Sequence, residues 1–166
     1  MDKPVVASLW QGRRLALVVA LTAALLVIFA SAAFAAVFDG TSGDDNFTGT
    51  PDTDRAVMRA GDDTATGLGR ADFLFGNSGD DDLYGGTGSD LIYGGVDSDL
   101  LVGGTGEDEI VGSYGDDTIY TGTMADGDKV SDEVQCGAGY DVVFLSGGDH
   151  ASHNTQAGKC EEINQY

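Results

Sequence analysis

Between residues 40 and 120, an apolar residue recurs at every ninth position of a chain otherwise rich in glycine and acidic side chains. In an extended backbone the residues on either side of each apolar position point away from it, because successive side chains of a strand alternate between its two faces. The pattern therefore predicts a strand of three residues in each repeat, with one side chain directed inward. The inward positions are Phe47, Ala56, Ala65, Leu74, Leu83, Ile92, Leu101, Ile110 and Ile119.

The same stretch divides into nine consecutive nonapeptides, and their sixth position is always aspartate. The first position is glycine in eight repeats, with Met58 as the exception, and the fourth is glycine in six. Glycine at the first, second and fourth positions is expected to permit φ > 0 and to leave carbonyl oxygens uncovered in a six-residue turn. The abundance of aspartate in the chain cannot by itself explain nine aspartates at the same position of nine repeats.

Two repeats with opposed turns complete one flattened coil, so the sequence predicts an all-β fold, a parallel β-roll or β-solenoid. Equivalent turns of successive coils would lie one strand spacing apart, about 4.8 Å. The aspartates should then form two ladders on opposite edges of the roll. One ladder contains Asp45, Asp63, Asp81, Asp99 and Asp117, and the other contains Asp54, Asp72, Asp90 and Asp108.

The domain boundaries follow from interruptions of this period. Residues 36–144 form the predicted roll, with repeats at 40–120 and 127–144 and a six-residue insertion at 121–126. Residues 145–166 are aperiodic and are expected to form a C-terminal cap or tail. The alternative is a separate C-terminal domain, but a segment of this size can hardly bury a core alone.

Residues 1–35 have the pattern of a signal peptide. A basic segment ending at Arg14 precedes the apolar run 15–30, and an A-x-A site follows at Ala33–Ala35. Cleavage there predicts a secreted, extracellular protein without a stable membrane span. An uncleaved anchor is the alternative, because the uncharged stretch 15–37 could nearly span a bilayer. The arginine pair before the apolar run leaves both Sec and twin-arginine export open.

The charge that remains after residue 35 restricts the partners of the chain. Five basic residues stand against 27 acidic ones, a net charge of −22. Such a chain excludes nucleic acid as a partner, because phosphates would repel it. Composition alone would favour a disordered, solvating chain. The fixed phase of the aspartates argues instead for a folded protein that attracts cations.

The most regular repeats are Gly76–Tyr84, Gly85–Tyr93 and Gly103–Val111. Their sequences resemble the RTX, or haemolysin-type, calcium-binding repeat G-G-x-G-x-D-x-U-x, in which U is a large apolar residue. The resemblance implies a β-roll that binds several Ca²⁺ ions between the turns of repeats i and i+2. The implied side-chain ligands are Asp45, Asp63, Asp72, Asp81, Asp90, Asp99, Asp108 and Asp117. The implied carbonyl ligands lie near Gly76, Gly79, Gly85, Gly88, Gly94, Gly103, Gly106 and Gly112.

Calcium also suits the chemistry of these turns. Carboxylates stacked one strand spacing apart repel each other by about 1 kcal/mol per pair in water, and by more near a protein surface. Ca²⁺ accepts about 6–8 oxygen ligands in flexible geometry, whereas Mg²⁺ demands a tighter octahedron and Zn²⁺ prefers histidine or cysteine. The alternative is a solvated acidic edge that discourages aggregation, but such an edge needs neither the first-position glycine nor a fixed phase.

Two further features concern the end of the roll and its outer surface. Cys136 and Cys160 are the only cysteines, and in an oxidising compartment they are expected to form a disulfide that staples the C-terminal cap. The alternative is a metal site formed by His150, His153 and Cys160. Outward positions of alternate repeats carry apolar side chains, either for docking a protein partner or a second copy, or for cross-strand packing. These are Phe73, Phe75, Leu91, Tyr93 and Val111.

No catalytic constellation is visible in the sequence, which contains neither G-x-S-x-G nor H-E-x-x-H. RTX repeats accompany proteases, lipases and pore-forming toxins, but the catalytic regions of those proteins are missing here. We therefore expect a non-enzymatic, extracellular calcium-binding module that folds when it binds Ca²⁺. The alternative is a structural or adhesive cell-surface protein that uses Ca²⁺ as a staple.

Overall fold

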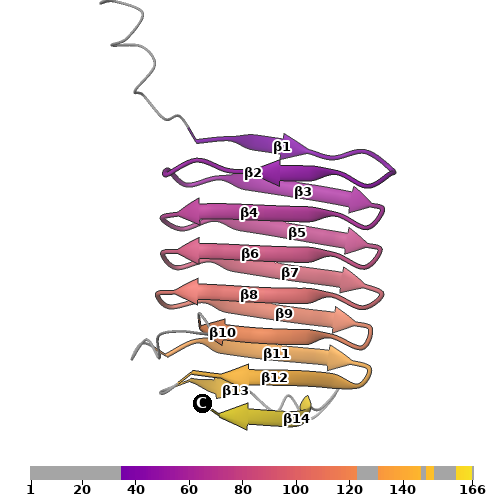
Figure 1. The fold of residues 1–166 in the computed structure, drawn as a ribbon, viewed down its shortest axis with the longest axis vertical. Helices are drawn as coiled ribbons and strands as arrows, with labels where there is room; N and C mark the ends of the chain where they lie inside the picture. Colours follow the sequence, from indigo (N-terminus) through magenta and orange to yellow (C-terminus); the bar gives the residue numbers. More distant parts are fainter. Residues whose placement is uncertain (1–34, 123–130, 147–148, 152–159, 166) are drawn as a thin grey trace, which may run out of the picture. The chain divides into compact units, whose positions relative to one another are not determined.

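The computed structural model describes residues 35–122, 131–146, 149–151 and 160–165. Over this part of the chain, successive strands alternate between two parallel sheets that stack face to face as a β-solenoid (Figure 1). The described residues contain no helix. The all-β roll predicted from the nonapeptide period is therefore confirmed.

Odd-numbered strands form one seven-stranded sheet, sheet A, and even-numbered strands form the other, sheet B. Sheet A contains β1 (Val37–Asp39), β3 (Arg55–Ala60), β5 (Phe73–Ser78), β7 (Leu91–Val96), β9 (Glu109–Tyr114), β11 (Glu133–Ala138) and β13 (His150–Ala151). Sheet B contains β2 (Asn46–Thr48), β4 (Thr64–Gly69), β6 (Asp82–Thr87), β8 (Leu100–Thr105), β10 (Thr118–Gly122), β12 (Asp141–Leu145) and β14 (Cys160–Gln165).

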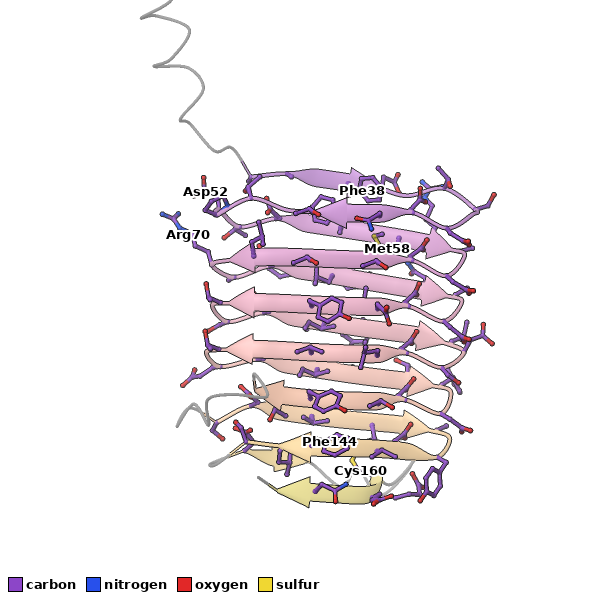
Figure 2. The ribbon with its side chains drawn as sticks, in the orientation of Figure 1. Phe38, Asp52, Met58, Arg70, Phe144 and Cys160 are labelled. Carbon is purple, nitrogen blue, oxygen red and sulfur yellow. A yellow bond between two sulfur atoms is a disulfide. The ribbon has the colours of Figure 1, made fainter. Side chains whose placement is uncertain are left out.

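The register places equivalent repeat positions directly above one another. Leu74 of β5 pairs with Ile92 of β7, and Leu83 of β6 pairs with Leu101 of β8. The eighth position is buried in every repeat and supplies one side chain per strand to the core between the sheets. Met58 adds a fully buried side chain to this core from a first position (Figure 2).

From β3 to β9 the strands are six residues long, not the three that the sequence predicts. Pairing between β5 and β7 starts at Phe73 and Leu91 and continues to Ser78 and Val96. The backbone ladder thus runs on through the first three positions of the next repeat, because backbone pairing does not require an apolar side chain.

The expectation about glycine is correct for the second and fourth positions and wrong for the first. Gly86 and Gly88, at the second and fourth positions of one repeat, have φ of 114° and 134°. The first-position glycines are absent from the left-handed region. At Gly94, for example, an added Cβ would lie 3.0 Å or less from a carboxylate oxygen of Asp99 and the carbonyl oxygen of Gly112. Glycine is required there by close approach, not by φ.

The C-terminal segment extends both sheets. Pairs that are 18 residues apart before β10 become 24 apart afterwards, as in Thr118 with Val142, so six extra residues lie between Gly122 and Ser131. The sequence placed the insertion at 121–126, but Thr121 and Gly122 belong to β10. Strand β13 pairs with β11, and β14 pairs with β12, so the tail contributes strands to both sheets.

The predicted disulfide between Cys136 and Cys160 is confirmed, and it joins β11 to β14 across the two sheets with a Cα–Cα distance of 5.4 Å. The alternative metal site is contradicted, because the sulfur of Cys160 is already bonded. His153 lies outside the described residues.

The predicted signal peptide, residues 1–35, lies outside the described residues except for Ala35. Among the residues that the structure does describe, there is no helix long and apolar enough to span a membrane.

Candidate metal-binding turns

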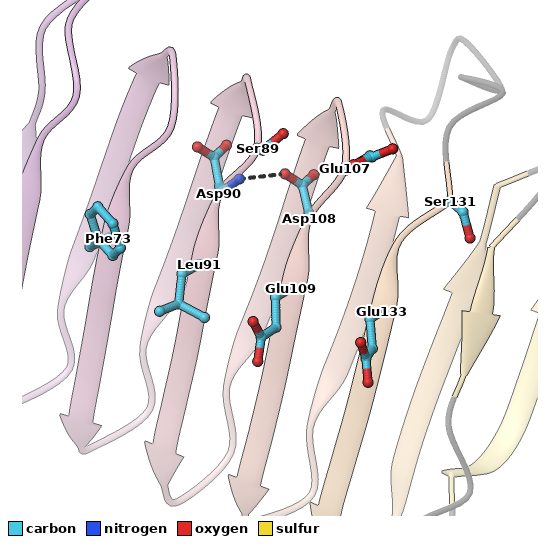
Figure 3. A pocket seen from close by; sticks show the side chains of 9 residues that line it. All are labelled: Phe73, Ser89, Asp90, Leu91, Glu107, Asp108, Glu109, Ser131 and Glu133. Carbon is cyan, nitrogen blue, oxygen red and sulfur yellow. Dashed lines mark hydrogen bonds between the residues drawn. The ribbon is translucent and has the colours of Figure 1, made fainter.

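The sixth-position aspartates form two hydrogen-bonded ladders, as the sequence predicts. In each, the Oδ1 atom accepts a hydrogen bond from the backbone N–H of the equivalent aspartate one coil earlier, over 2.6–3.1 Å. Figure 3 shows this bond between the N–H of Asp90 and the carboxylate of Asp108. On the A-to-B edge, where the chain passes from sheet A to sheet B, the ladder runs Asp45, Asp63, Asp81, Asp99, Asp117 and Asp141. On the B-to-A edge it runs Asp54, Asp72, Asp90, Asp108, Asp132 and Asp149.

In seven of the described rungs the second carboxylate oxygen has no hydrogen-bond donor. These side chains point into the roll, and Asp72, Asp90 and Asp99 expose 3% or less of their surface. The Oδ2 atoms buried in this way belong to Asp63, Asp72, Asp81, Asp90, Asp99, Asp117 and Asp141. A buried oxygen without a partner costs about 1–3 kcal/mol, and more when it is charged.

A backbone carbonyl oxygen approaches the same first-position glycine as such a carboxylate oxygen. Asp81 Oδ2 and the carbonyl oxygen of Gly94 both lie within 2.6 Å of the point where a Cβ on Gly76 would sit. The same convergence recurs at Gly85, where Asp90 Oδ2 meets the carbonyl oxygen of Gly103. Two acceptors directed at one region repel each other unless a positive group lies between or beside them.

Burial raises the pKa of these carboxyl groups. The pKa of Asp99 rises from 3.8 to about 8, chiefly because its charged form is desolvated and secondarily because Asp117, Asp81 and Asp80 are negative. Desolvation also raises the pKa values of Asp81, Asp90 and Asp117 to about 6. At neutral pH the interior of the roll therefore holds carboxylates that favour either a proton or a cation.

These residues fit a hard cation with oxygen ligands. Carboxylate and carbonyl oxygens are the ligands that Ca²⁺ prefers, and successive turns present both. Among the residues that the structure describes, no three acidic, histidine or cysteine side chains gather into one cluster. Each turn from Asp54 onwards contributes one buried carboxylate, so the remaining ligands of an ion would be backbone carbonyls and the aspartate of the next coil.

The predicted carbonyl ligands divide into two groups. The carbonyl oxygens of Gly85, Gly94, Gly103 and Gly112 lie close to first-position glycines of the preceding coil, beside the buried carboxylates. In contrast, the fourth-position glycines Gly79, Gly88 and Gly106 approach the fourth-position carbonyl of the coil before them. The carbonyl oxygen of Gly76 accepts a hydrogen bond from the side-chain amide of Asn77.

Asp45 and Asp141 both differ from what the predicted set of ligands implies. Asp45, a predicted ligand, already receives hydrogen bonds from the backbone N–H and hydroxyl of Thr41 on its Oδ2 atom. Asp141 was not predicted as a ligand, yet it continues the A-to-B ladder and its N–H donates to the carboxylate of Glu161. The phase of the resumed repeats could have identified Asp141 and Asp132, whereas Asp149 lies in aperiodic sequence.

The outer face of sheet A carries the predicted apolar patch, with one exception. Phe73 and Tyr93 expose 41% and 37% of their surface, and the rings of Phe75 and Tyr93 stack at 5.9 Å. Val111 is only 7% exposed and is not part of this surface. A shallow depression beside the patch is lined by Phe73 and Leu91 together with acidic and serine side chains (Figure 3).

Comparison with known proteins agrees with this geometry. Residues 59–92 and 93–123 each match the family described as the RTX calcium-binding nonapeptide repeat (4 copies). No curated protein and no solved structure matches the chain.

Proposed function

We propose, on the premise that residues 59–123 carry RTX calcium-binding repeats, that this chain is a secreted, non-enzymatic β-roll module that folds when it binds Ca²⁺. Its ladders of buried aspartates would hold several ions along the two edges of the roll. Bound calcium would neutralise the negative charge of the stacked carboxylates.

The observation that carries this proposal is the buried Oδ2 atom without a donor, which recurs at Asp63, Asp72, Asp81, Asp90, Asp99, Asp117 and Asp141. A chain that folds without a cation must bury these oxygens either charged and unpaired or protonated. The core that opposes this cost is thin, since each repeat contributes one inward side chain. Ordering costs about 1–2 kcal/mol per residue for the backbone alone. Binding of a cation to the folded state only would shift the equilibrium towards folding.

A calcium titration followed by circular dichroism tests the proposal. The chain starting at residue 36, in chelator, is expected to be largely unfolded and to gain β-structure at about 10⁻⁴–10⁻³ M Ca²⁺, the range of extracellular modules. Mg²⁺ at the same concentration serves as the control and should produce little β-structure. Full β-content in excess chelator would contradict the proposal.

Secretion and the absence of catalysis belong to the same proposal. The apolar, A-x-A-terminated segment 1–35 and the disulfide between Cys136 and Cys160 both suit an oxidising, extracellular location. Export also suits a calcium-dependent fold, because the chain would remain unfolded until it meets extracellular calcium. Appearance of a processed, disulfide-bonded chain in the medium of expressing cells would support secretion.

A structural or adhesive role is the second candidate, and the apolar patch of Phe73, Phe75, Leu91 and Tyr93, of which Phe73 and Tyr93 are exposed, favours it. Exposed aromatic clusters on β-surfaces commonly mark contact sites. Concentration-dependent mass in calcium, measured by light scattering, would support self-association through this patch. A Tyr93→Ser variant should then remain monomeric, whereas a Tyr84→Ser variant on sheet B should associate normally.

A further inference from the structure

Three of the four terminal rungs of the ladders accept hydrogen bonds on Oδ2 from nearby hydroxyl or amide groups. They are Asp45 and Asp54 at the N-terminal end and Asp149 at the C-terminal end of the B-to-A ladder. The Oδ2 atoms of Asp63, Asp72, Asp81, Asp90, Asp99 and Asp117 accept none, and neither does that of Asp141, which ends the A-to-B ladder.

At the N-terminal end, the donors come from second-position threonines. The N–H and the hydroxyl of Thr41 donate to Asp45 Oδ2 over 2.6 Å and 3.0 Å. The N–H of Thr50 donates to Asp54 Oδ2, and its hydroxyl donates to Oδ1 over 3.0 Å. The carboxylates of these two repeats are therefore satisfied within their own turns.

The backbone of these two turns is also different. The second position lies in the left-handed region at Arg59, Leu68, Asn77 and Ser113, with φ of 79–87°, whereas Thr41 and Thr50 do not. Correspondingly, β1 and β2 end after three residues, while strands β3 to β11 continue through the second position. The first two turns thus fold towards their aspartate and do not continue the ladder.

At the C-terminal end, two hydroxyl groups converge on one carboxylate. The side chains of Thr121 and Ser146 both donate to Asp149 Oδ2, the latter over 2.7 Å. Thr121 occupies a first position, where the interior repeats have glycine, and its Oγ1 accepts the N–H of Ser146 over 3.0 Å. Asp149 and both hydroxyl-bearing residues are buried.

We infer that Thr41, Thr50, Thr121 and Ser146 are hydroxyl caps that replace calcium at these three terminal rungs and restrict the ions to the other rungs of the ladders. This inference rests on the proposed function. Asp45 Oδ2 and Asp149 Oδ2 each accept two hydrogen bonds, and three donors share the two oxygens of Asp54, so a cation would have to displace donors to bind there. A solenoid needs ends that satisfy its terminal coils, and at these three ladder ends the caps do so without metal.

Counting bound ions tests the inference. Equilibrium dialysis of the chain starting at residue 36 against saturating Ca²⁺ gives the number of ions per chain. The D45N/D54N variant, which changes two capped rungs, should bind as many ions as wild type. The matched D81N/D99N variant, which changes two interior rungs, should bind at least one ion fewer. Equal losses in the two variants would overturn the inference, whereas a wild-type chain that binds no calcium would refute the proposed function itself.

A second measurement does not depend on the interior variant folding. Hydrogen exchange of residues 132–145 at saturating Ca²⁺ should be faster in T121V/S146A than in wild type, because Asp149 loses both donors. A tenfold increase in Ca²⁺ should not restore protection, since the rung is not a metal site. The control Thr118→Val, on the outer face of the same strand, should behave as wild type. Recovery of protection with added calcium would overturn the inference.

Discussion

The backbone N–H of Asp81 donates to Oδ1 of Asp99, one coil further along, over 3.0 Å, while Oδ2 of Asp99 is buried without a donor. One oxygen of the carboxylate thus joins two coils, and the other leaves a negative charge inside the roll. The same side chain both builds the solenoid and makes it dependent on a cation.

Replacing Asp99 by asparagine should separate these two roles. The amide can still accept the N–H of Asp81, and its NH₂ group can face the acceptor that Oδ2 now faces. Without calcium, the free energy of unfolding is expected to rise by about 1–3 kcal/mol, because a buried unpaired oxygen is removed. Calcium affinity should fall about tenfold, a loss near 1.4 kcal/mol. Calorimetry with Asp54→Asn as the control measures both; a parallel change in the control would contradict the prediction.

The stability of the calcium-free roll should increase as pH falls. The pKa is about 8 for folded Asp99 and about 6 for Asp81, Asp90 and Asp117, whereas in the unfolded chain an aspartate titrates near 3.9. Between these values the folded chain binds more protons than the unfolded one, so stability rises from pH 8 towards pH 4 and then levels off. Circular dichroism in calcium-free buffer checks this, and Asp99→Asn should show a smaller gain. Less β-structure at pH 5 than at pH 8 would count against it.

A methyl group at a first-position glycine should damage the roll. In Gly94→Ala the new Cβ would lie 3.0 Å or less from Asp99 Oδ2 and the Gly112 carbonyl oxygen. Overpacking of this kind costs about 1–3 kcal/mol, so the melting temperature in saturating calcium should fall by several degrees. Gly43→Ala is the matched control, because an added Cβ there meets nothing within 4 Å. Equal melting temperatures for the two variants would disprove the role of close approach.

Reduction of the disulfide between Cys136 and Cys160 should fray only the C-terminal coils. The bond ties β14 to β11, and each coil of a solenoid interacts mainly with its neighbours. At saturating Ca²⁺, hydrogen exchange should accelerate from β11 onwards while residues 76–93 stay protected. Loss of protection in residues 76–93 would instead show that the disulfide nucleates folding of the whole roll.

The nonapeptide phase was sufficient to predict the parallel roll, the inward apolar column and both aspartate ladders. These features follow from the sequence because one coil equals two repeats, so every position lies above its own equivalent, as Leu74 lies beside Ile92. The pairing of Cys136 with Cys160 was equally accessible, since the chain has no other cysteine.

What only the tertiary structure decided is which donors and acceptors meet. First-position glycine is needed because a carboxylate and a carbonyl from neighbouring turns converge on it, and a sequence period carries no distances. Asp149 joins a ladder from aperiodic sequence, where the Thr121 and Ser146 hydroxyls satisfy it. The Thr41 hydroxyl satisfies Asp45, which occupies the same sixth position as the interior aspartates. Repetition specifies the coil, but the satisfaction of a buried charge depends on the few atoms around it, which differ where the repetition ends.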